Sequence, residues 1–235
     1  SLYSELQGPA LPGIVSELQQ VPYLNQIVIG LDRADKDQYL HAREFFASLP
    51  QHHRILWNDC PRLRAIDEEL QALGLAPTEA GKGRNVWYCL GYTLASRRSQ
   101  AIALHDCDIL TYSRELLARL IYPVANPGFN YQFCKGYYAR VADGKINGRV
   151  CRLMVTPLLR ALKKILGSID YIDYLDSFRY PLAGEFSFRT DVVHDLRIPS
   201  DWGLEIGLLS EMYRNYSTNR ICQVDIADIY DHKHQ

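Results

Sequence analysis

The stretch AIALHDCDIL, residues 101–110, decides how the rest of the chain is interpreted. Small and apolar residues run into two carboxylates, Asp106 and Asp108, where a buried strand is expected to reach solvent. Alternate residues of a strand share one face, so the spacing predicts that both carboxylates point the same way. Two oxygen ligands of this kind suit Mg2+ or Mn2+. On the triplet alone, the plainer interpretation is favoured, in which acidic residues mark a turn or begin a helix.

Around this stretch, strand-like and helix-like segments alternate, which is the pattern of an α/β sheet. The predicted strands cover residues 26–31, 54–58, 101–107, 131–141, 185–189 and 220–230. The predicted helices cover residues 14–21, 36–48, 61–73, 86–97, 113–124, 153–166, 191–196 and 202–216. Asp35 and Pro61 are placed to begin two of these helices. The segments 1–13 and 81–85 are predicted as loops, and the pattern over 170–178 is ambiguous.

Composition narrows the class of protein. The 235 residues are 47% apolar and 23% charged, with a net charge of −1, which is ordinary for a globular chain of one large domain. The balanced charge does not point to a nucleic-acid or membrane surface, and no apolar run is long enough to span a bilayer. The six cysteines form no C-x-x-C pair, which disfavours a zinc site and predicts free thiols in the cytoplasm.

Three further groups are candidates for ligand binding. In Gly81-Lys82-Gly83, the glycines would let the backbone approach a ligand and the lysine would meet a phosphate or a base carbonyl, although a plain surface loop is the simpler interpretation. Glu205, in an apolar helix start, either binds sugar hydroxyls or faces water at a helix N-terminus. His232 and His234 either complete a carboxylate metal site or are exposed terminal residues.

Together these segments resemble a known family. In chain order, the matching blocks are GKG (81–83), DCD (106–108), KGYY (135–138), GRV (148–150), PLL (157–159), LAGE (182–185), GLEIGLL (203–209) and His232. They resemble the retaining, nucleotide-sugar-dependent glycosyltransferases of the glucosyl-3-phosphoglycerate synthase and glucosylglycerate synthase type. The resemblance covers about two-thirds of the chain, from Gly81 onward. It implies a GT-A (Rossmann-like) α/β fold, with a mixed, mainly parallel central sheet flanked by helices.

The resemblance also implies roles for individual residues. Lys82 would contact the nucleotide and Asp106 its ribose, while Asp108 and His232, with Asp106 beside them, would hold Mg2+ or Mn2+ across the diphosphate. Glu205 would hydrogen-bond the transferred sugar. Further contacts are implied for the lining of the sugar pocket and for the acceptor segment 148–156, at residues Gly184, Glu185, Arg149 and Thr156.

The implied activity is a metal-dependent transfer of glucose, with retention, from a UDP- or GDP-glucose-like donor to 3-phosphoglycerate or glycerate. A mannosyl or other hexosyl transferase, or a non-catalytic nucleotide-sugar-binding module, is the alternative. Neither nucleic acid nor membrane is an expected partner, and a homodimer is a family-level expectation. No residue is nominated as a covalent nucleophile, because the family's front-face route needs none.

The chain departs from the family in three places. The family opens with a strand that floors the nucleotide site, whereas this chain begins at Ser1, so we expect a single domain, 1–235, without its first strand and C-terminal extension. Its nucleotide-binding half would be 1–125 and its sugar- and acceptor-binding half 126–235. Thr156 replaces a frequent arginine, which puts a phosphorylated acceptor in doubt, with Arg149 as one substitute. The 32–35 segment differs from the family's nucleotide loop, so base recognition is expected to differ.

Overall fold

The structure, a computed structural model, describes residues 3–76, 79–142 and 145–231. The helices are α1 (Ala10–Gln19), α2 (Lys36–Phe46), α3 (Pro61–Ala72), α4 (Lys82–Ser96), α5 (Arg114–Ala125), α6 (Thr156–Leu166), α7 (Asp170–Asp176) and α8 (Leu204–Asn215). The strands are β1 (Ile27–Leu31), β2 (His53–Trp57), β3 (Ala101–Leu104), β4 (Phe133–Tyr138), β5 (Val141–Ala142), β6 (Lys145–Ile146), β7 (Phe186–Arg189) and β8 (Ile221–Ala227). A π-helical turn, Cys151–Val155, leads into α6.

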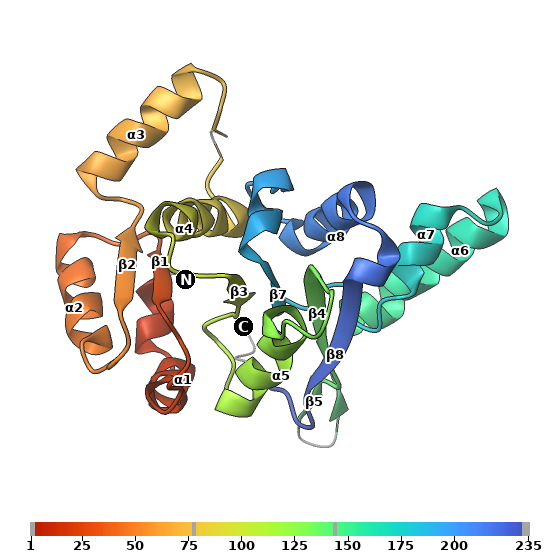
Figure 1. The fold of residues 1–235 in the computed structure, drawn as a ribbon, viewed down its shortest axis with the longest axis horizontal. Helices are drawn as coiled ribbons and strands as arrows, with labels where there is room; N and C mark the ends of the chain where they lie inside the picture. Colours follow the sequence, from red (N-terminus) through yellow and green to blue (C-terminus); the bar gives the residue numbers. More distant parts are fainter. Residues whose placement is uncertain (1–2, 77–78, 143–144, 232–235) are drawn as a thin grey trace.

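The predicted mixed sheet is confirmed. The main sheet has the order β3-β7-β4-β8, and β1 and β2 form a separate parallel pair (Figure 1). Strand β7 runs antiparallel to both β3 and β4, whereas β4 and β8 are parallel. Among the described strands, the pairs β1–β2 and β4–β8 are parallel, whereas β3–β7, β4–β7 and β5–β6 are antiparallel. Parallel pairings therefore do not predominate in this part of the chain.

The alternation of β4 builds a core on each face of the main sheet. Cys134 packs into one apolar cluster together with Leu116 and Leu120 of α5. Its neighbour Phe133 faces the other way, into a cluster that includes Phe186 of β7 and residues of α4 and α8. Adjacent side chains of a strand point to opposite faces of the sheet, so β4 contributes to both layers. Helices α4 and α8 are thereby held on one face of the sheet, with their N-termini near each other.

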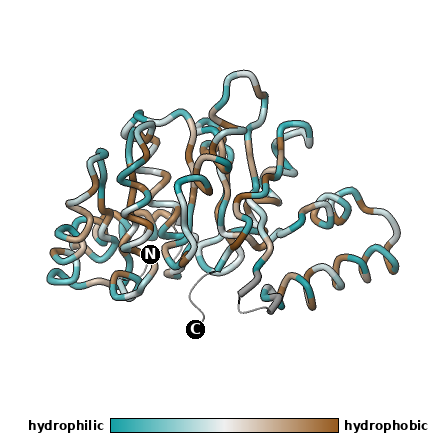
Figure 2. The backbone as a smooth tube through the Cα atoms, turned by 90° about the horizontal axis from the view of Figure 1, so that it is seen from below, coloured by the Kyte–Doolittle hydropathy of each residue, from teal (hydrophilic) through white to brown (hydrophobic). Residues whose placement is uncertain are grey.

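Helices α6 and α7 form an arm that extends from this body (Figures 1 and 2). Apolar and polar residues alternate along the arm in Figure 2. Leu158 and Ile165 of α6 leave 50% and 78% of their surface exposed. No helix within the described ranges is long and apolar enough to cross a membrane.

Several element boundaries differ from the sequence-based expectation. Helix α1 begins at Ala10, inside the segment predicted as a loop, and residues 170–176 are helical. Helix α4 begins at Lys82 rather than at residue 86, so this lysine lies in the first turn of a helix. Strand β3 ends at Leu104. The prediction that Asp106 and Asp108 share a strand face is therefore wrong, since both lie in the loop that follows β3. The capping role of Asp35 is confirmed by its reciprocal bonds with Gln38.

Candidate active site

Three predicted site residues meet at one place although they are far apart in sequence. The Lys82 Nζ atom lies 2.8 Å from Oδ1 of Asp106 and 2.9 Å from Oε1 of Glu205. Lys82 comes from the first turn of α4, Asp106 from the loop after β3, and Glu205 from the first turn of α8. Glu205 is the least exposed of the three, with 17% of its side chain accessible. Its carboxylate is therefore partnered by Lys82 rather than solvated alone.

The two glycines around Lys82 have a packing role. A Cβ atom on Gly83 would lie 1.7 Å from the Pro199 carbonyl oxygen, and one on Gly81 would lie 2.6 Å from the Cα of Asp201. The backbone N–H of Arg84 donates to the Ser200 carbonyl at 2.8 Å. The glycines therefore bring the start of α4 against the segment that leads into α8.

Electrostatics keeps Lys82 charged. Burial lowers the pKa of Lys82, but the carboxylates of Asp106 and Glu205 outweigh this effect and hold its pKa above the usual range. A helix N-terminus also favours anions, because its first backbone N–H groups have no partner within the helix. The start of α4 therefore presents a permanent cation and a favourable dipole at the same place. This combination suits a phosphate-bearing ligand.

Gly184 and Glu185 form one wall of this cluster. A Cβ atom on Gly184 would lie 2.2 Å from Oδ2 of Asp106 and 3.1 Å from Nζ of Lys82. Glu185 is fully buried, and the Tyr230 hydroxyl donates to its Oε1 at 2.7 Å. Its Oε2 has no hydrogen-bond partner in the described part of the chain. Burial, and next the charge of Asp106, raise the pKa of Glu185 to about 7.

Two residues that the sequence analysis did not assign to the site also line or support this wall. Lys135 is 1% exposed in the middle of β4, and its Nζ donates to the Ala183 carbonyl at 2.5 Å. Tyr230 holds Glu185 from the other side and stacks on Tyr138, with ring centroids 3.5 Å apart. A lone charge in an apolar strand was a usable signal for Lys135. No local signal marked Tyr230.

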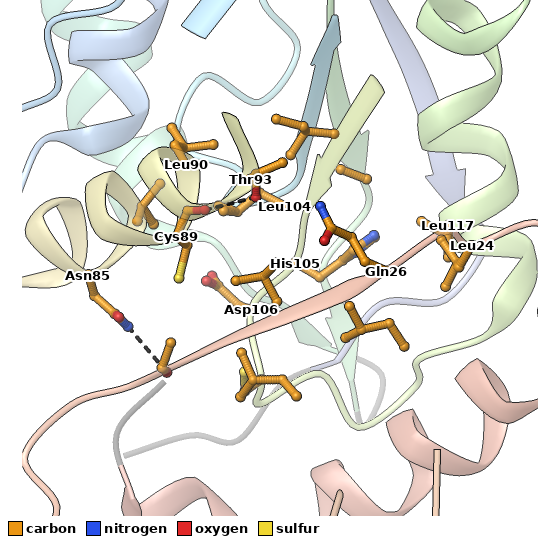
Figure 3. A pocket seen from close by; sticks show the side chains of 18 of the residues that line it. Leu24, Gln26, Asn85, Cys89, Leu90, Thr93, Leu104, His105, Asp106 and Leu117 are labelled. Carbon is orange, nitrogen blue, oxygen red and sulfur yellow. Dashed lines mark hydrogen bonds between the residues drawn. The ribbon is translucent and has the colours of Figure 1, made fainter. Parts of the chain in front are cut away.

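A cavity of about 1250 Å3 opens beside the cluster and runs between β1 and β3. Lys82, Asp106 and Asp108 lie along its wall. Figure 3 shows Asn85, Cys89 and Thr93 of α4 along one side, with His105 and Asp106 next to them. Deeper in, the lining is formed by the apolar residues of β1 and β3, at residues Ile27, Val28, Ile29, Ala101, Ile102, Ala103 and Leu104.

Polar atoms inside this slot lack partners. Both ring nitrogens of His105 and the Oε1 atom of Gln26 are buried without a hydrogen bond to any described residue. Burial lowers the pKa of His105 to about 4, so its ring is neutral at pH 7. Among the described strands, β1 pairs only with β2, and β3 only with β7. Two strand edges, the His105 ring and the Oε1 atom of Gln26 thus face the same apolar slot.

The remaining predicted residues lie elsewhere or outside the description. Arg149 is exposed ahead of the π-helical turn, and Thr156 lines a separate cavity of about 190 Å3. His232 and His234 lie outside the described residues. Within the described ranges, no group of three or more His, Cys, Asp or Glu side chains is arranged to hold a metal ion. The structure therefore unites Lys82, Asp106, Glu205 and the Gly184 wall, but not Arg149 or Thr156.

Curated relatives match the whole chain. It is 49% identical over 235 residues to glucosyl-3-phosphoglycerate synthase from Persephonella marina, and 44% identical over 237 residues to that from Methanococcoides burtonii. The match covers 100% of this chain but 58% of each relative. The enzyme from Mycobacterium tuberculosis is 28% identical over 173 residues, 70% of this chain and 49% of its own. No protein-family model matches the chain.

Solved structures agree on the fold. Glucosyl-3-phosphoglycerate synthase from Mycobacterium tuberculosis, in complex with Mn2+, UDP-glucose and phosphoglyceric acid, superimposes with a TM-score of 0.69 at 20% identity. That match covers 100% of this chain and 70% of the solved one. The same protein with Mg2+ and UDP gives a TM-score of 0.66 at 20% identity, covering 96% of this chain and 67% of that one. The chain is thus a homologue of the glucosyl-3-phosphoglycerate synthases along its whole length and has their GT-A fold.

Proposed function

We propose that this chain forms the donor-binding and catalytic unit of a metal-dependent glucosyltransferase. The donor would be a UDP- or GDP-glucose-like nucleotide sugar, and the acceptor 3-phosphoglycerate or glycerate. The observation that carries the proposal is the meeting of Lys82, Asp106 and Glu205 within 2.9 Å contacts beside an open cavity. The similarity of the whole chain to 58% of the length of two glucosyl-3-phosphoglycerate synthases supports the same conclusion.

Lys82 and Asp106 would bind the nucleotide portion of the donor. Lys82 provides a fixed positive charge at a helix N-terminus, where a diphosphate gains from both the charge and the dipole. A ribose hydroxyl donates readily to a carboxylate, so Asp106 suits the adjacent ribose. Binding would exchange the present ion pair between these two side chains for contacts with the ligand. Because both are about one-third exposed, this exchange has a modest energetic cost.

The metal would be held by Asp108 and His232, with Asp106 next to them. Two carboxylates and an imidazole fit a hard divalent cation such as Mn2+ or Mg2+. Asp106 and Asp108 line the same cavity. Asp231, the residue before His232, bonds through its backbone to Leu110 and Thr111, two and three residues after Asp108. A cation there would neutralise charge that develops on the leaving diphosphate.

Glu205 and the Gly184 wall would hold the transferred glucose. Glu205 presents a carboxylate at the rim, and hydroxyl groups of a hexose are natural donors to it. Neither nearby carboxylate is presented as a nucleophile, since Lys82 holds Glu205 and Tyr230 holds the fully buried Glu185. The proposed function therefore includes retention of the anomeric configuration by a front-face route, in which the leaving group itself helps deprotonate the acceptor.

The acceptor would approach from the 148–156 segment. A Cβ atom on Gly148 would lie 3.3 Å from the Tyr180 hydroxyl, and the Tyr180 ring lies 5.1 Å from that of Tyr138. Tyr138 in turn stacks on Tyr230, which holds Glu185. A column of tyrosines thus links the predicted acceptor segment to the sugar pocket. Arg149 and Thr156 remain proposed acceptor contacts, with Arg149 supplying charge for a carboxylate or phosphate.

The two halves, 1–125 and 126–235, are proposed to work as one domain that takes up a further strand. The apolar slot between β1 and β3 would receive an extended segment whose backbone satisfies both strand edges, His105 and Gln26. That strand would also floor the nucleotide site. A homodimer and a reducing, cytoplasmic setting complete the proposal, the latter because all six cysteines are free thiols.

Ligand-induced stabilisation tests the proposed function. UDP-glucose at about a hundred times its dissociation constant should stabilise the fold by roughly 2.7 kcal/mol in the presence of Mn2+. Asp108→Ala should abolish the part of this gain that depends on Mn2+, whereas Asp37→Ala, an exposed aspartate in the first turn of α2, should retain it. GDP-glucose and GDP-mannose in parallel wells separate the donors.

Equal stabilisation with and without Mn2+ would contradict the metal-dependent proposal. Metal-dependent binding without glucose transfer to glycerate or 3-phosphoglycerate would favour a non-catalytic nucleotide-sugar-binding module instead. Glucose transfer is measured as the release of UDP, and the stereochemistry of the product is determined by NMR. An inverted product would contradict retention.

A further inference from the structure

Lys135 occupies a position where a charged side chain is costly. It lies in the middle of β4, between β7 and β8, and only 1% of its surface is exposed. Lysine is almost never fully buried unless its charge is compensated, because an ammonium group loses its hydration there. The strand would be simpler to build with an apolar residue at this position. The contacts of the ammonium group therefore need a reason beyond the fold.

Those contacts hold one short segment in place. The Nζ atom of Lys135 donates to the Ala183 carbonyl at 2.5 Å and lies 5.4 Å from the centre of the Phe186 ring. The next residue of β4, Gly136, donates its backbone N–H to the Glu185 carbonyl at 2.9 Å. Two consecutive residues of a central strand thus fasten the two residues that flank Gly184. Strand β4 therefore fixes the position of Gly184 through the residue on each side of it.

Gly184 transmits this position to the donor-binding groups. Its Cα lies so close to Asp106 that a Cβ would fall 2.2 Å from the carboxylate and 3.1 Å from Lys82 Nζ. There is no slack between the segment and the ion pair of Lys82 with Asp106. A shift of the 183–185 segment by a few tenths of an ångström would therefore change where these two side chains sit. Lys135 acts on both of them through this segment and touches neither.

The positive charge of Lys135 makes a second contribution to the donor-binding groups. The charged groups that face Lys135 are Lys82 of α4, Asp106 after β3, Glu185 before β7 and Glu205 of α8. Burial lowers the pKa of Lys135 to about 8, against the opposing pull of Glu205 and Glu185. It therefore still carries most of its charge at pH 7. Asp106, Glu205 and the partly ionised Glu185 would otherwise be balanced by Lys82 alone, which would disfavour an approaching diphosphate.

We propose that Lys135 is a positioning residue for glucosyl transfer, which fixes the 183–185 segment against Asp106 and offsets the carboxylates under the donor. The inference rests on the proposed function. It extends the site by a layer beneath the residues that would contact the ligand. Lys135 would act without contacting the donor, so its removal is expected to change where Asp106, Lys82 and Glu205 lie rather than to delete a contact.

Lys135→Met tests this, with Lys164→Met as the matched control on the exposed face of α6. Replacing a buried charge by a well-fitting apolar side chain is often neutral or stabilising, so Lys135→Met should melt within a few degrees of wild type or higher. Calorimetry should nevertheless show donor affinity, measured with UDP-glucose and Mn2+, weakened by about tenfold or more. Steady-state kinetics should show a lower kcat with an unchanged KM for the acceptor. Lys164→Met should match wild type in all three measurements.

A donor affinity and kcat within twofold of wild type in folded Lys135→Met would overturn the proposal. If Lys135→Met does not fold, Lys135→Gln decides by the same measurements, because it removes the charge and its side chain is one bond too short to keep the 2.5 Å contact with the Ala183 carbonyl. Loss of donor affinity in folded Lys135→Gln supports the proposal, and wild-type affinity overturns it. Failure of the wild-type protein itself to bind UDP-glucose or GDP-glucose would instead refute the proposed function, so the two failures are distinguishable.

Discussion

Gly184→Ala is the sharpest perturbation of the site, since it adds one methyl group beside Asp106. The new Cβ would lie 2.2 Å from Oδ2 of Asp106, well inside contact distance, and the nearest relief is rotation of that carboxylate. Rotation breaks the 2.8 Å ion pair between Asp106 and Lys82, whose side chains are 35% and 37% exposed, respectively. A pair this exposed contributes about 0–1 kcal/mol to folding. The variant should therefore fold, with a melting temperature lower by at most about 2–4 °C.

Donor binding should suffer far more than stability. Asp106 and Lys82 would both be displaced from the positions that meet the ribose and the diphosphate. We expect the affinity for UDP-glucose with Mn2+ to fall by about tenfold or more, which corresponds to about 1.4 kcal/mol. Isothermal calorimetry measures the affinity, and a urea titration of the same samples measures the free energy of unfolding.

Gly91→Ala is the matched control. Gly91 lies inside α4, and a Cβ there would meet nothing within 4 Å. Alanine is the better helix former, so this variant should gain about 0.5–1 kcal/mol in stability with unchanged donor affinity. If Gly184→Ala binds UDP-glucose as tightly as wild type, Gly184 does not set the position of Asp106 and the reasoning is refuted. A loss of several kcal/mol in stability would also refute it, because the carboxylate would then be unable to rotate away.

The other predictions address neighbouring groups. Tyr230→Phe removes the 2.7 Å hydrogen bond to the buried Glu185 and should cost about 1–3 kcal/mol in the free energy of unfolding, measured in urea. Glu205→Gln should lower kcat by about tenfold or more while the affinity for UDP alone changes little, since the nucleotide does not need the sugar contact. Because the pKa of Lys135 is lowered to about 8 in the folded chain, the unfolded chain binds more protons between pH 8 and 10.5, so wild-type stability should gain a contribution that rises with pH there. Lys135→Met should lack this contribution, and stability curves of equal slope in that window would count against the buried charge. Adding EDTA should remove the melting-temperature gain produced by UDP-glucose with Mn2+, whereas an unchanged gain would argue that no metal takes part.

Much of the fold was predictable because its signals are local. Alternation located the strands, and the cap at Asp35 and Pro61 at the first position of α3 located helix starts. The ordered blocks pointed to Lys82, Asp106, Gly184 and Glu205. The errors arose where a local rule was extended too far: β3 ends at Leu104, so strand alternation does not reach the carboxylates. The glycines beside Lys82 approach the 199–201 backbone, a contact that no local pattern indicates.

The sequence by itself determined the class of fold and the residue types of the site, because strand alternation, helix periodicity and capping depend on neighbours a few residues apart. Only the tertiary structure decided which of those residues meet. Strand β7 inserts between β3 and β4, and this order carries Gly184 to Asp106 and places Lys135 beneath both. Strand order follows from how distant segments share a core, and no pattern within one segment records it. The proximity of Lys82 to Glu205, 123 residues away, has the same origin.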